Sequence, residues 1–279
     1  VCMLLCLVLM LCKVLPIRGV KAWRRVINFI ENMMAELLIQ QQGAVLKLGL
    51  NRPEKKNALS QQMYRQLSAA LAQAAEDSSI HVVLLHGSSD CFSAGNDLLD
   101  FLGAGELNRQ HPTVQFLYQL AQFNKPLVAA VAGLAIGIGT TALLHCDLVY
   151  AADNARFQLP FTQLGLCPEA GSSVLLPNLV GYQRAAQFLL LGEAFGASDA
   201  LQMGLVNQVV TGQELLALAE EKAAKLAALP ADAVQSSKAL LKRSVQTLTI
   251  DTIAAELVQF QRLLQSEPCQ QRISAFFKR

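Results

Sequence analysis

Charged side chains are scarce in this 279-residue sequence. Asp, Glu, Lys and Arg make up 16% of it, whereas 53% of the residues are hydrophobic. This shortage of charge indicates a large core and an apolar surface that other subunits cover. The net charge is only +2, and no basic segment with interleaved aromatic residues occurs. We therefore expect no nucleic acid among the partners.

Cysteine pairs and metal-ligand spacings are also missing. The seven cysteines form no C-x-x-C pair, and the four histidines are scattered. We therefore expect no metal, no disulfide framework and a reducing compartment, which for a bacterial protein is the cytoplasm. The C-terminal Phe277-Lys278-Arg279 differs from the peroxisomal S-K-L signal.

No apolar run reaches the roughly 20 residues that a membrane span needs, so we expect no membrane partner for the core. Residues 1–12 are wholly apolar but short, and they lack the basic start of a secretory signal, although a small signal core stays open. Residues 20–38 have the pattern of an amphipathic helix, and Met34 resembles a natural start. We expect an extension over 1–35, unstructured or outside the native protein, a core over 36–229 and a helical oligomerisation region over 230–279.

Strand and helix patterns alternate along the core, which predicts an α/β fold. Buried or alternating apolar runs predict strands at 44–50, 81–86, 127–131, 147–151 and 206–210. Helical periodicity predicts helices at 60–76, 98–102, 113–123, 183–191, 198–203, 213–229, 231–243, 250–265 and 269–277. The stretch 153–177 is rich in Pro, Gly and Ser, so we expect it to be irregular.

Three glycines, Gly133, Gly137 and Gly139, follow the apolar strand 127–131 and precede a helical pattern. A strand, a glycine-rich turn and a helix start leave backbone N–H groups free for an anion, or for an oxygen that becomes one. The spacing is not G-x-G-x-x-G, and no P-loop lysine follows, so no nucleotide fingerprint is present. Tight packing of strand on helix explains the glycines equally well.

A second small-residue loop lies at 91–98, with the sequence CFSAGNDL. Asp97 there is better placed to accept hydrogen bonds at a helix start than to act in catalysis. We expect His145 to be a core residue at a helix end, Asp147 to brace the strand that follows it, and Asp199 to lie in the first turn of a helix.

Five segments taken together resemble the crotonase family, the enoyl-CoA hydratases and isomerases. They are NRPEKKNALS at 51–60, FSAGNDL at 92–98, KPLVAAVAGLAIGIG at 125–139, CDLVYA at 146–151 and DALQMGLVNQVV at 199–210. The resemblance is collinear from about residue 37 onward. It implies a spiral of ββα repeats with a C-terminal helical region, assembly into a homotrimer or dimer of trimers, an acyl-CoA thioester as substrate and no cofactor beyond that CoA.

The resemblance also implies an oxyanion hole, in which the backbone N–H groups of Asn96 and Ile138 hold the thioester oxygen. Ile138 is a departure, because most relatives have glycine there. Each such donor is worth about 3–4 kcal/mol in comparable sites. The positions implied to contact CoA or substrate are Lys55, Lys56, Asn57, Ala58, Leu59, Ser93, Ala94, Gly95, Asp97, Gly137 and Phe161. Lysines are common on any surface, so Lys55 and Lys56 are equally explained as solvated side chains.

Hydratases of this family use two glutamates, and this chain has Thr141 and Phe161 at the corresponding positions. Neither side chain transfers a proton at neutral pH. Glu169, in CPEAGSS, resembles the single catalytic glutamate of the Δ3,Δ2-enoyl-CoA isomerases, whose P-E-G-x-S-S setting differs at Ala170. Without the resemblance, Glu169 is an ordinary loop acid.

The resemblance therefore implies an isomerase of fatty-acid β-oxidation, with Glu169 moving a proton from C2 to C4 of a 3-enoyl-CoA. Two alternatives stay open. One is another crotonase reaction on an acyl-CoA, such as hydration, and the other is a non-catalytic acyl-CoA-binding module.

Overall fold

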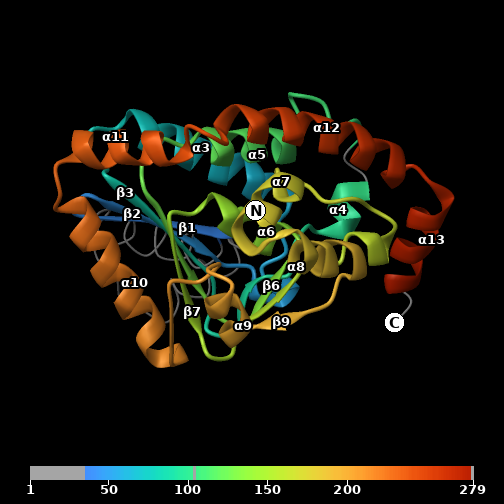
Figure 1. Ribbon diagram of the computed structural model, residues 1–279, viewed down its shortest axis with the longest axis horizontal. Helices are drawn as coiled ribbons and strands as arrows, with labels where there is room; N and C mark the ends of the chain where they lie inside the picture. The colour runs from blue at the N-terminus through green and yellow to red at the C-terminus, as the bar shows by residue number, and fades with distance from the viewer. Residues whose placement is uncertain (1–34, 103–104, 278–279) are drawn as a thin grey trace, which may run out of the picture.

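The larger of two sheets forms the centre of the molecule. A computed structural model describes residues 35–102 and 105–277 (Figure 1). This sheet has the strand order β1 (Leu37–Gln42), β2 (Val45–Leu50), β3 (Val82–His86), β5 (Leu127–Val131), β7 (Leu148–Ala152) and β10 (Gln208–Val210). Strand β1 pairs antiparallel with β2, and the other neighbours are parallel.

A smaller sheet repeats the connectivity of the larger one. Its order is β4 (Cys91–Ser93), β6 (Leu134–Ile136), β8 (Arg156–Gln158) and β9 (Phe195–Gly196). Each of β3, β5 and β7 is followed in the chain by a strand of this second sheet, which gives the expected ββα repeat. The link from β5 to β6 requires Gly133, because a Cβ there would lie 1.7 Å from the carbonyl oxygen of Asp90.

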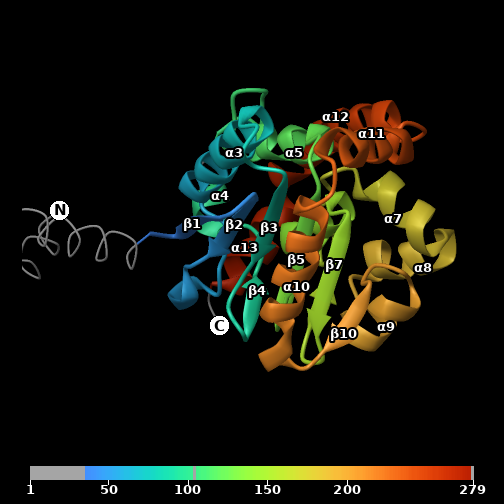
Figure 2. The same ribbon diagram turned by 90° about the vertical axis from the view of Figure 1, so that its left-hand side faces the viewer.

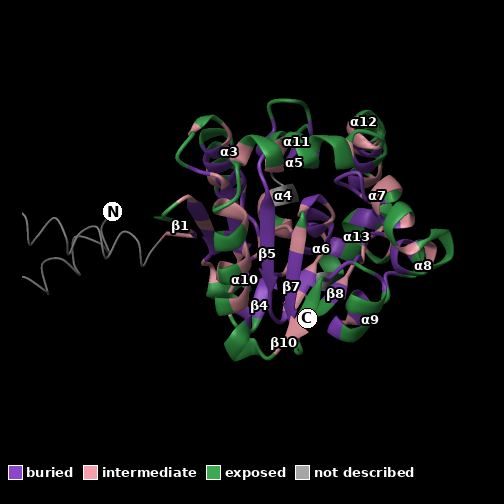
Figure 3. Cartoon of the chain, turned by 60° about the vertical axis from the view of Figure 1, so that its left-hand side comes forward, coloured by how far each residue is buried: buried purple, intermediate pink, exposed green. Residues whose placement is uncertain are grey.

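Both faces of the larger sheet are buried at its central strands, because β2, β3, β5 and β7 carry apolar residues at odd and even positions. On one face, Val82, Leu84, Val128 and Ala130 cluster with residues of α10 (Gly212–Ala227), the helix drawn in front of the sheet in Figure 2. On the other face, Val83, Leu85, Leu127, Ala129 and Val131 belong to the main core. Figure 3 shows these strands as buried and the outward surfaces of the helices as exposed.

The main core lies between the sheets and the remaining helices. The helices before the glycine-rich turn are η1 (Pro53–Lys55), α3 (Gln61–Glu76), α4 (Leu98–Leu102) and α5 (Pro112–Gln122). Those in the second half are α6 (Ile138–Thr141), η2 (Ala142–His145), η3 (Thr162–Leu164), α7 (Ser172–Val180), α8 (Tyr182–Ala186), η4 (Gln187–Leu191) and α9 (Ala197–Gln202). The C-terminal helices are α11 (Ala231–Lys242), α12 (Gln246–Leu264) and α13 (Glu267–Phe276), and α12 packs on α5 and α7 (Figure 1).

Two expectations from the sequence are wrong in part. Residues 37 and 38 belong to β1 and not to a helix, because Leu37 and Leu38 pair with β2. The stretch 153–177 is not wholly irregular, since it contains β8 and the start of α7. The sequence does not predict helix α7, because the residue before its first turn is Gly171, which has no side chain to cap the helix.

The expectations for the N-terminal 34 residues lie outside the described residues, and the boundaries at 36 and 229 stay predictions. Within 35–102 and 105–277, no helix combines the length and the apolar character needed to cross a membrane.

Candidate active site

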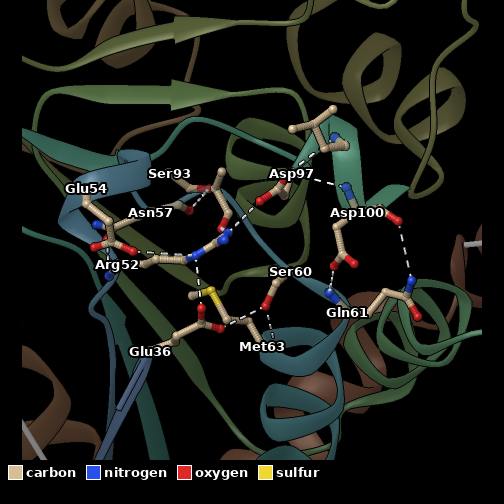
Figure 4. A network of polar contacts seen from close by, with 12 residues as sticks. Glu36, Arg52, Glu54, Asn57, Ser60, Gln61, Met63, Ser93, Asp97 and Asp100 are labelled. Carbon is tan, nitrogen blue, oxygen red and sulfur yellow. Dashed lines mark hydrogen bonds and ion pairs between the residues drawn. The ribbon is translucent and has the colours of Figure 1, made fainter. Parts of the chain in front are cut away.

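Arg52 joins the loop after β2 to the loop after β4 (Figure 4). Its guanidinium Nη1 lies 2.8 Å from Asp97 Oδ2 and donates to the carbonyl oxygen of Ala58 at 3.0 Å. Its Nε lies 2.9 Å from Glu36 Oε1. Burial raises the pKa of Asp97, but the hydrogen bonds from Arg52 and from backbone N–H groups outweigh burial and lower it. The Asp97 carboxylate also accepts from the N–H groups of Leu99 and Asp100, which is the helix-start role expected from the sequence.

Four of the residues expected near CoA have buried side chains, namely Asn57, Leu59, Ser93 and Phe161. The side-chain amide of Asn57 donates to the carbonyl oxygen of Cys91 at 2.9 Å, and Ser93 Oγ donates to the carbonyl oxygen of Asn57 at 2.9 Å. The N–H of Gly95 donates back to Ser93 Oγ at 3.1 Å, and the N–H of Leu59 donates to the carbonyl oxygen of Gly95 at 2.8 Å. These bonds fix the path of the backbone that presents Asn96.

The glycine-rich turn packs directly against this loop. A Cβ on Gly139 would lie 2.9 Å from the carbonyl oxygen of Ser93, and a Cβ on Gly95 would lie 2.9 Å from that of Ile136. Only glycine permits so close an approach of two backbones. Among the described residues, the backbone N–H groups of Asn96 and Ile138 have no hydrogen-bond acceptor. The Ile138 side chain, the departure from the family pattern, is fully buried in the main core.

A cavity of about 790 Å³ opens beside these two loops. Nine of the expected site residues line it, namely Lys55, Lys56, Ala58, Ala94, Gly95, Asn96, Asp97, Gly137 and Phe161. Fourteen further residues line it, and sequence reasoning did not single out most of them, among them Gln158, Gln163, Leu164, Leu166, Arg272 and Ile273. Asn57, Leu59, Ser93, Ile138 and Glu169 do not line it.

Glu169 does not line the cavity, and its side chain is almost wholly buried. Its Oε1 accepts a hydrogen bond of 3.3 Å from Thr141 Oγ1, so the glycine-rich turn and the loop before α7 meet at this carboxylate. Burial, with the negative charge of Glu256 as a second cause, raises the pKa of Glu169 to about 8, while the Thr141 hydroxyl opposes the shift. Such a carboxyl holds its proton more strongly than an ordinary glutamate, and its ionised form is a stronger base.

Tyr64 of α3 is a polar group of the site that sequence reasoning missed. Its hydroxyl donates to the side-chain oxygen of Asn96. Burial and the nearby Glu169 charge raise the pKa of Tyr64 well above its ordinary value, so the phenol stays neutral. The available signal was the helical period, because Tyr64 precedes the buried residues Leu67 and Leu71 by three and seven positions.

Other polar residues brace the elements around the site. His145 is buried as expected, and burial is the main cause that lowers its pKa to about 4, so the ring is neutral. The carboxylate of Asp147 accepts from the N–H of Leu127 at 2.7 Å, and that of Asp199 accepts from the N–H of Gly196 at 3.1 Å. In the part of the chain that the structure describes, no three His, Cys, Asp or Glu side chains are grouped to hold a metal ion.

Comparison with known proteins identifies the family to which this chain belongs. The family model described as enoyl-CoA hydratase/isomerase matches residues 40–279. The 2,3-dehydroadipyl-CoA hydratase of Escherichia coli is 39% identical over 88% of this chain and 97% of its own length. The enoyl-CoA delta isomerase 2 of Rattus norvegicus is 34% identical over 87% of this chain, which spans 63% of that longer protein.

Solved structures agree with the sequence relatives. The structure of Pseudomonas aeruginosa OdaA superposes with a TM-score of 0.85 at 40% identity, covering 88% of this chain and 99% of the other. An enoyl-CoA hydratase/isomerase from Pseudoalteromonas atlantica also gives a TM-score of 0.85, at 39% identity and over 88% of this chain and 97% of its own. The chain therefore belongs to the crotonase superfamily of enoyl-CoA hydratases and isomerases, and it has that superfamily's fold.

Proposed function

We propose that this acyl-CoA enzyme is a Δ3,Δ2-enoyl-CoA isomerase that uses Glu169 as its only acid–base group. The observation that carries the proposal is the pairing of a buried carboxylate with a hydroxyl, Glu169 with Thr141, where a hydratase would have a second carboxylate. A single base suits a reaction in which the proton removed from one carbon is returned to another. Water is not a reactant, which agrees with a carboxylate that solvent barely reaches.

In the proposed reaction, Glu169 takes a proton from C2 of a 3-enoyl-CoA. The C2–H electrons form a C1=C2 bond as the C1=O electrons move onto the thioester oxygen, which gives a dienolate whose C3=C4 bond is conjugated with C1=C2. The N–H groups of Asn96 and Ile138 would stabilise that oxygen. Glu169 then returns the proton to C4, which leaves the 2-trans-enoyl-CoA and the enzyme unchanged. No cofactor is needed beyond the CoA of the substrate.

The position of Glu169 sets a condition on this proposal. Its carboxylate does not line the cavity, whereas the residue Asn96 does. The acyl group must therefore enter the space between Asn96 and Glu169, and side chains there must shift when it binds. Phe161 at the cavity wall, 4% exposed, and the buried Phe92 would keep water from the dienolate.

The second candidate is hydration of a 2-enoyl-CoA. The 39% identity to a 2,3-dehydroadipyl-CoA hydratase favours it, and the named relatives include both hydratases and isomerases. Hydration needs one group to activate water and one to protonate carbon. With Thr141 and Phe161 at the two family positions, Glu169 would have to do both.

The discriminating experiment compares 3-hexenoyl-CoA with crotonyl-CoA as substrates for the wild type and Glu169→Gln. We expect the wild type to isomerise 3-hexenoyl-CoA and not to hydrate crotonyl-CoA. Loss of the base should reduce kcat about 10²- to 10⁴-fold with little change in KM. Hydration of crotonyl-CoA without isomerisation would contradict the proposal. Tight CoA binding without turnover of any enoyl-CoA would favour a binding module instead.

We also propose that the protein assembles as a homotrimer or a dimer of trimers. Large apolar side chains on its surface support this, among them Tyr182, Leu190, Leu191, Leu240, Leu241 and Val258. Light scattering coupled to size-exclusion chromatography tests it, and a monomeric mass would contradict it.

A further inference from the structure

The peptide group between Ala170 and Gly171 is held at both of its polar atoms. Its carbonyl oxygen, that of Ala170, lies 2.7 Å from Nε2 of His145 in η2. Its N–H, that of Gly171, donates at 2.7 Å to Oε2 of Glu256 in α12. Two elements distant in the sequence therefore grip one peptide, immediately after Glu169.

The backbone at this peptide is one that few sequences adopt unaided. Ala170 has φ +60 and Gly171 has φ +71, so two consecutive residues are left-handed. For a residue with a side chain, such a conformation is unfavourable and persists only where its surroundings impose it. A Cβ on Gly171 would also lie 2.9 Å from Cγ2 of Thr249 in α12. The turn and α12 are thus fitted closely together.

Glu256 is placed as the missing cap of α7. Helix α7 begins after Gly171, which has no side chain to accept from the helix N–H groups. Oε1 of Glu256 accepts from the N–H of Ser173 at 2.9 Å and from its hydroxyl. On α12, Glu256 is the charged member of a buried stripe formed by Thr249, Ile253, Glu256, Phe260 and Leu264. A buried carboxylate surrounded by donors supplies what the first turn of α7 lacks.

From this geometry we propose that His145 and Glu256 are positioning residues, which clamp the Ala170–Gly171 peptide and thereby fix the carboxylate of Glu169. The proposal rests on the isomerase function for its kinetic consequence. The clamp itself can be measured without any substrate. A displacement of about 1 Å at a reacting group can lower a rate about 10²-fold, so a loosened turn should be visible in kcat.

The charge of Glu256 gives the clamp a second consequence. The titratable groups that interact with Glu169 are Glu256, Tyr64 and Cys167. Burial is the main cause that raises the pKa of Tyr64 well above 10 and that of Cys167 to about 11, so both are neutral near pH 8. Burial raises the pKa of Glu256, while the bonds from Ser173 and Gly171 oppose that rise. Removing the Glu256 charge should therefore make Glu169 ionise at lower pH.

The test uses Glu256→Gln and Glu256→Asp, with Asp251→Asn as the matched control. Asp251 is an exposed acid on the same helix, so its replacement removes one charge without touching the turn. We expect Glu256→Gln to lower kcat about 10- to 100-fold with little change in KM, and to move the acid limb of the pH profile to lower pH. Glu256→Asp keeps the charge, so its acid limb should stay near that of the wild type.

His145→Leu separates geometry from charge. It removes the other half of the clamp, but the neutral imidazole contributes no charge. We expect a lower kcat and an unmoved acid limb. Hydrogen–deuterium exchange of the peptide that covers 169–175 should be faster in both Glu256→Gln and His145→Leu, and unchanged in Asp251→Asn.

Unchanged exchange in Glu256→Gln would overturn the clamp whatever reaction the enzyme catalyses. Faster exchange with wild-type kcat would overturn the positioning role while leaving the isomerase function intact. Full activity of Glu169→Gln, by contrast, would overturn the proposed function alone. If Glu256→Gln does not fold, Glu256→Asp carries the test, because its shorter side chain must release at least one of the bonds to Gly171 and Ser173.

Discussion

Thr141 Oγ1 lies 3.3 Å from Glu169 Oε1, so the residue that stands in a hydratase's glutamate position donates a hydrogen bond to the carboxylate on the opposite loop. This bond lowers the pKa of Glu169, against the rise caused by burial and by Glu256. Two effects on the pKa of Glu169 therefore oppose each other: the Thr141 hydrogen bond lowers it, and the negative charge of Glu256 adds to the rise caused by burial. Each can be removed separately.

Thr141→Val should move the acid limb of kcat/KM to higher pH, because valine fills the same space without a donor. A hydrogen bond worth about 0.5–1.5 kcal/mol corresponds to a 2- to 12-fold loss of kcat/KM near neutral pH. Thr141→Ser keeps the hydroxyl and should retain the wild-type profile. A valine variant with the wild-type profile would show that the hydroxyl does not act on Glu169.

The wild-type enzyme should be most active in mildly alkaline solution. The proposed reaction requires ionised Glu169, and its pKa of about 8 means that the carboxylate is mostly protonated at neutral pH. Isomerase kcat/KM should therefore rise with pH and level off above about pH 8. Steady-state kinetics from about pH 6 to about pH 9 would check this. An acid limb near the ordinary glutamate value would contradict the assignment of Glu169 as a buried base.

Much of the fold was predictable, because strands such as 127–131 can be recognised in the sequence as short apolar runs between turn residues. The start of α3 and the end of α10 were also predictable, because the Ser60 cap and Pro230 are local signals. Helix α7 was not predictable in this way. The side chain that accepts a hydrogen bond from Ser173 in its first turn is Glu256, which lies 83 residues further along the chain. No local pattern can report a cap supplied by another helix.

Some residues of the candidate site were likewise predictable from the sequence, and others were not. The small-residue loops after two strands are visible in the sequence, whereas the choice of Asn96 and Ile138 within them came from the family resemblance and stays a prediction. Tyr64 and Glu256 could not be named, because each lies on the buried face of a helix, where an apolar residue is the usual occupant. The resemblance also grouped Asn57 and Ser93 with ligand contacts, whereas their side chains hold the loop from inside.

Lys55 and Lys56 should contribute to binding and not to the chemical step. Both are exposed at the cavity that Asn96 lines, where they can face the phosphates of CoA. The double change Lys55→Ala/Lys56→Ala should raise KM for an acyl-CoA about tenfold with kcat unchanged, and the effect should shrink as salt is added. Lys225→Ala, at an exposed position of α10, is the control. A KM equal to that of the wild type would show that neither lysine contributes to binding of the acyl-CoA.

Glu169→Gln should stabilise the fold while it abolishes activity. Because the pKa of Glu169 is about 8 when folded and near 4.5 in an unfolded chain, the folded state holds a proton that the unfolded state releases between these values. The stability of the wild type therefore falls as pH rises from about 4.5 to about 8, and no further loss from this group occurs above that.

Glutamine does not ionise, so the stability of the variant should not fall with pH through this residue. The difference in Tm between Glu169→Gln and the wild type should be small near pH 5 and should grow to a plateau above about pH 8. Asp251→Asn, at an exposed site, should show no such growth. A Tm difference that is independent of pH would mean that Glu169 ionises normally. In that case its burial could not be what makes it a strong base.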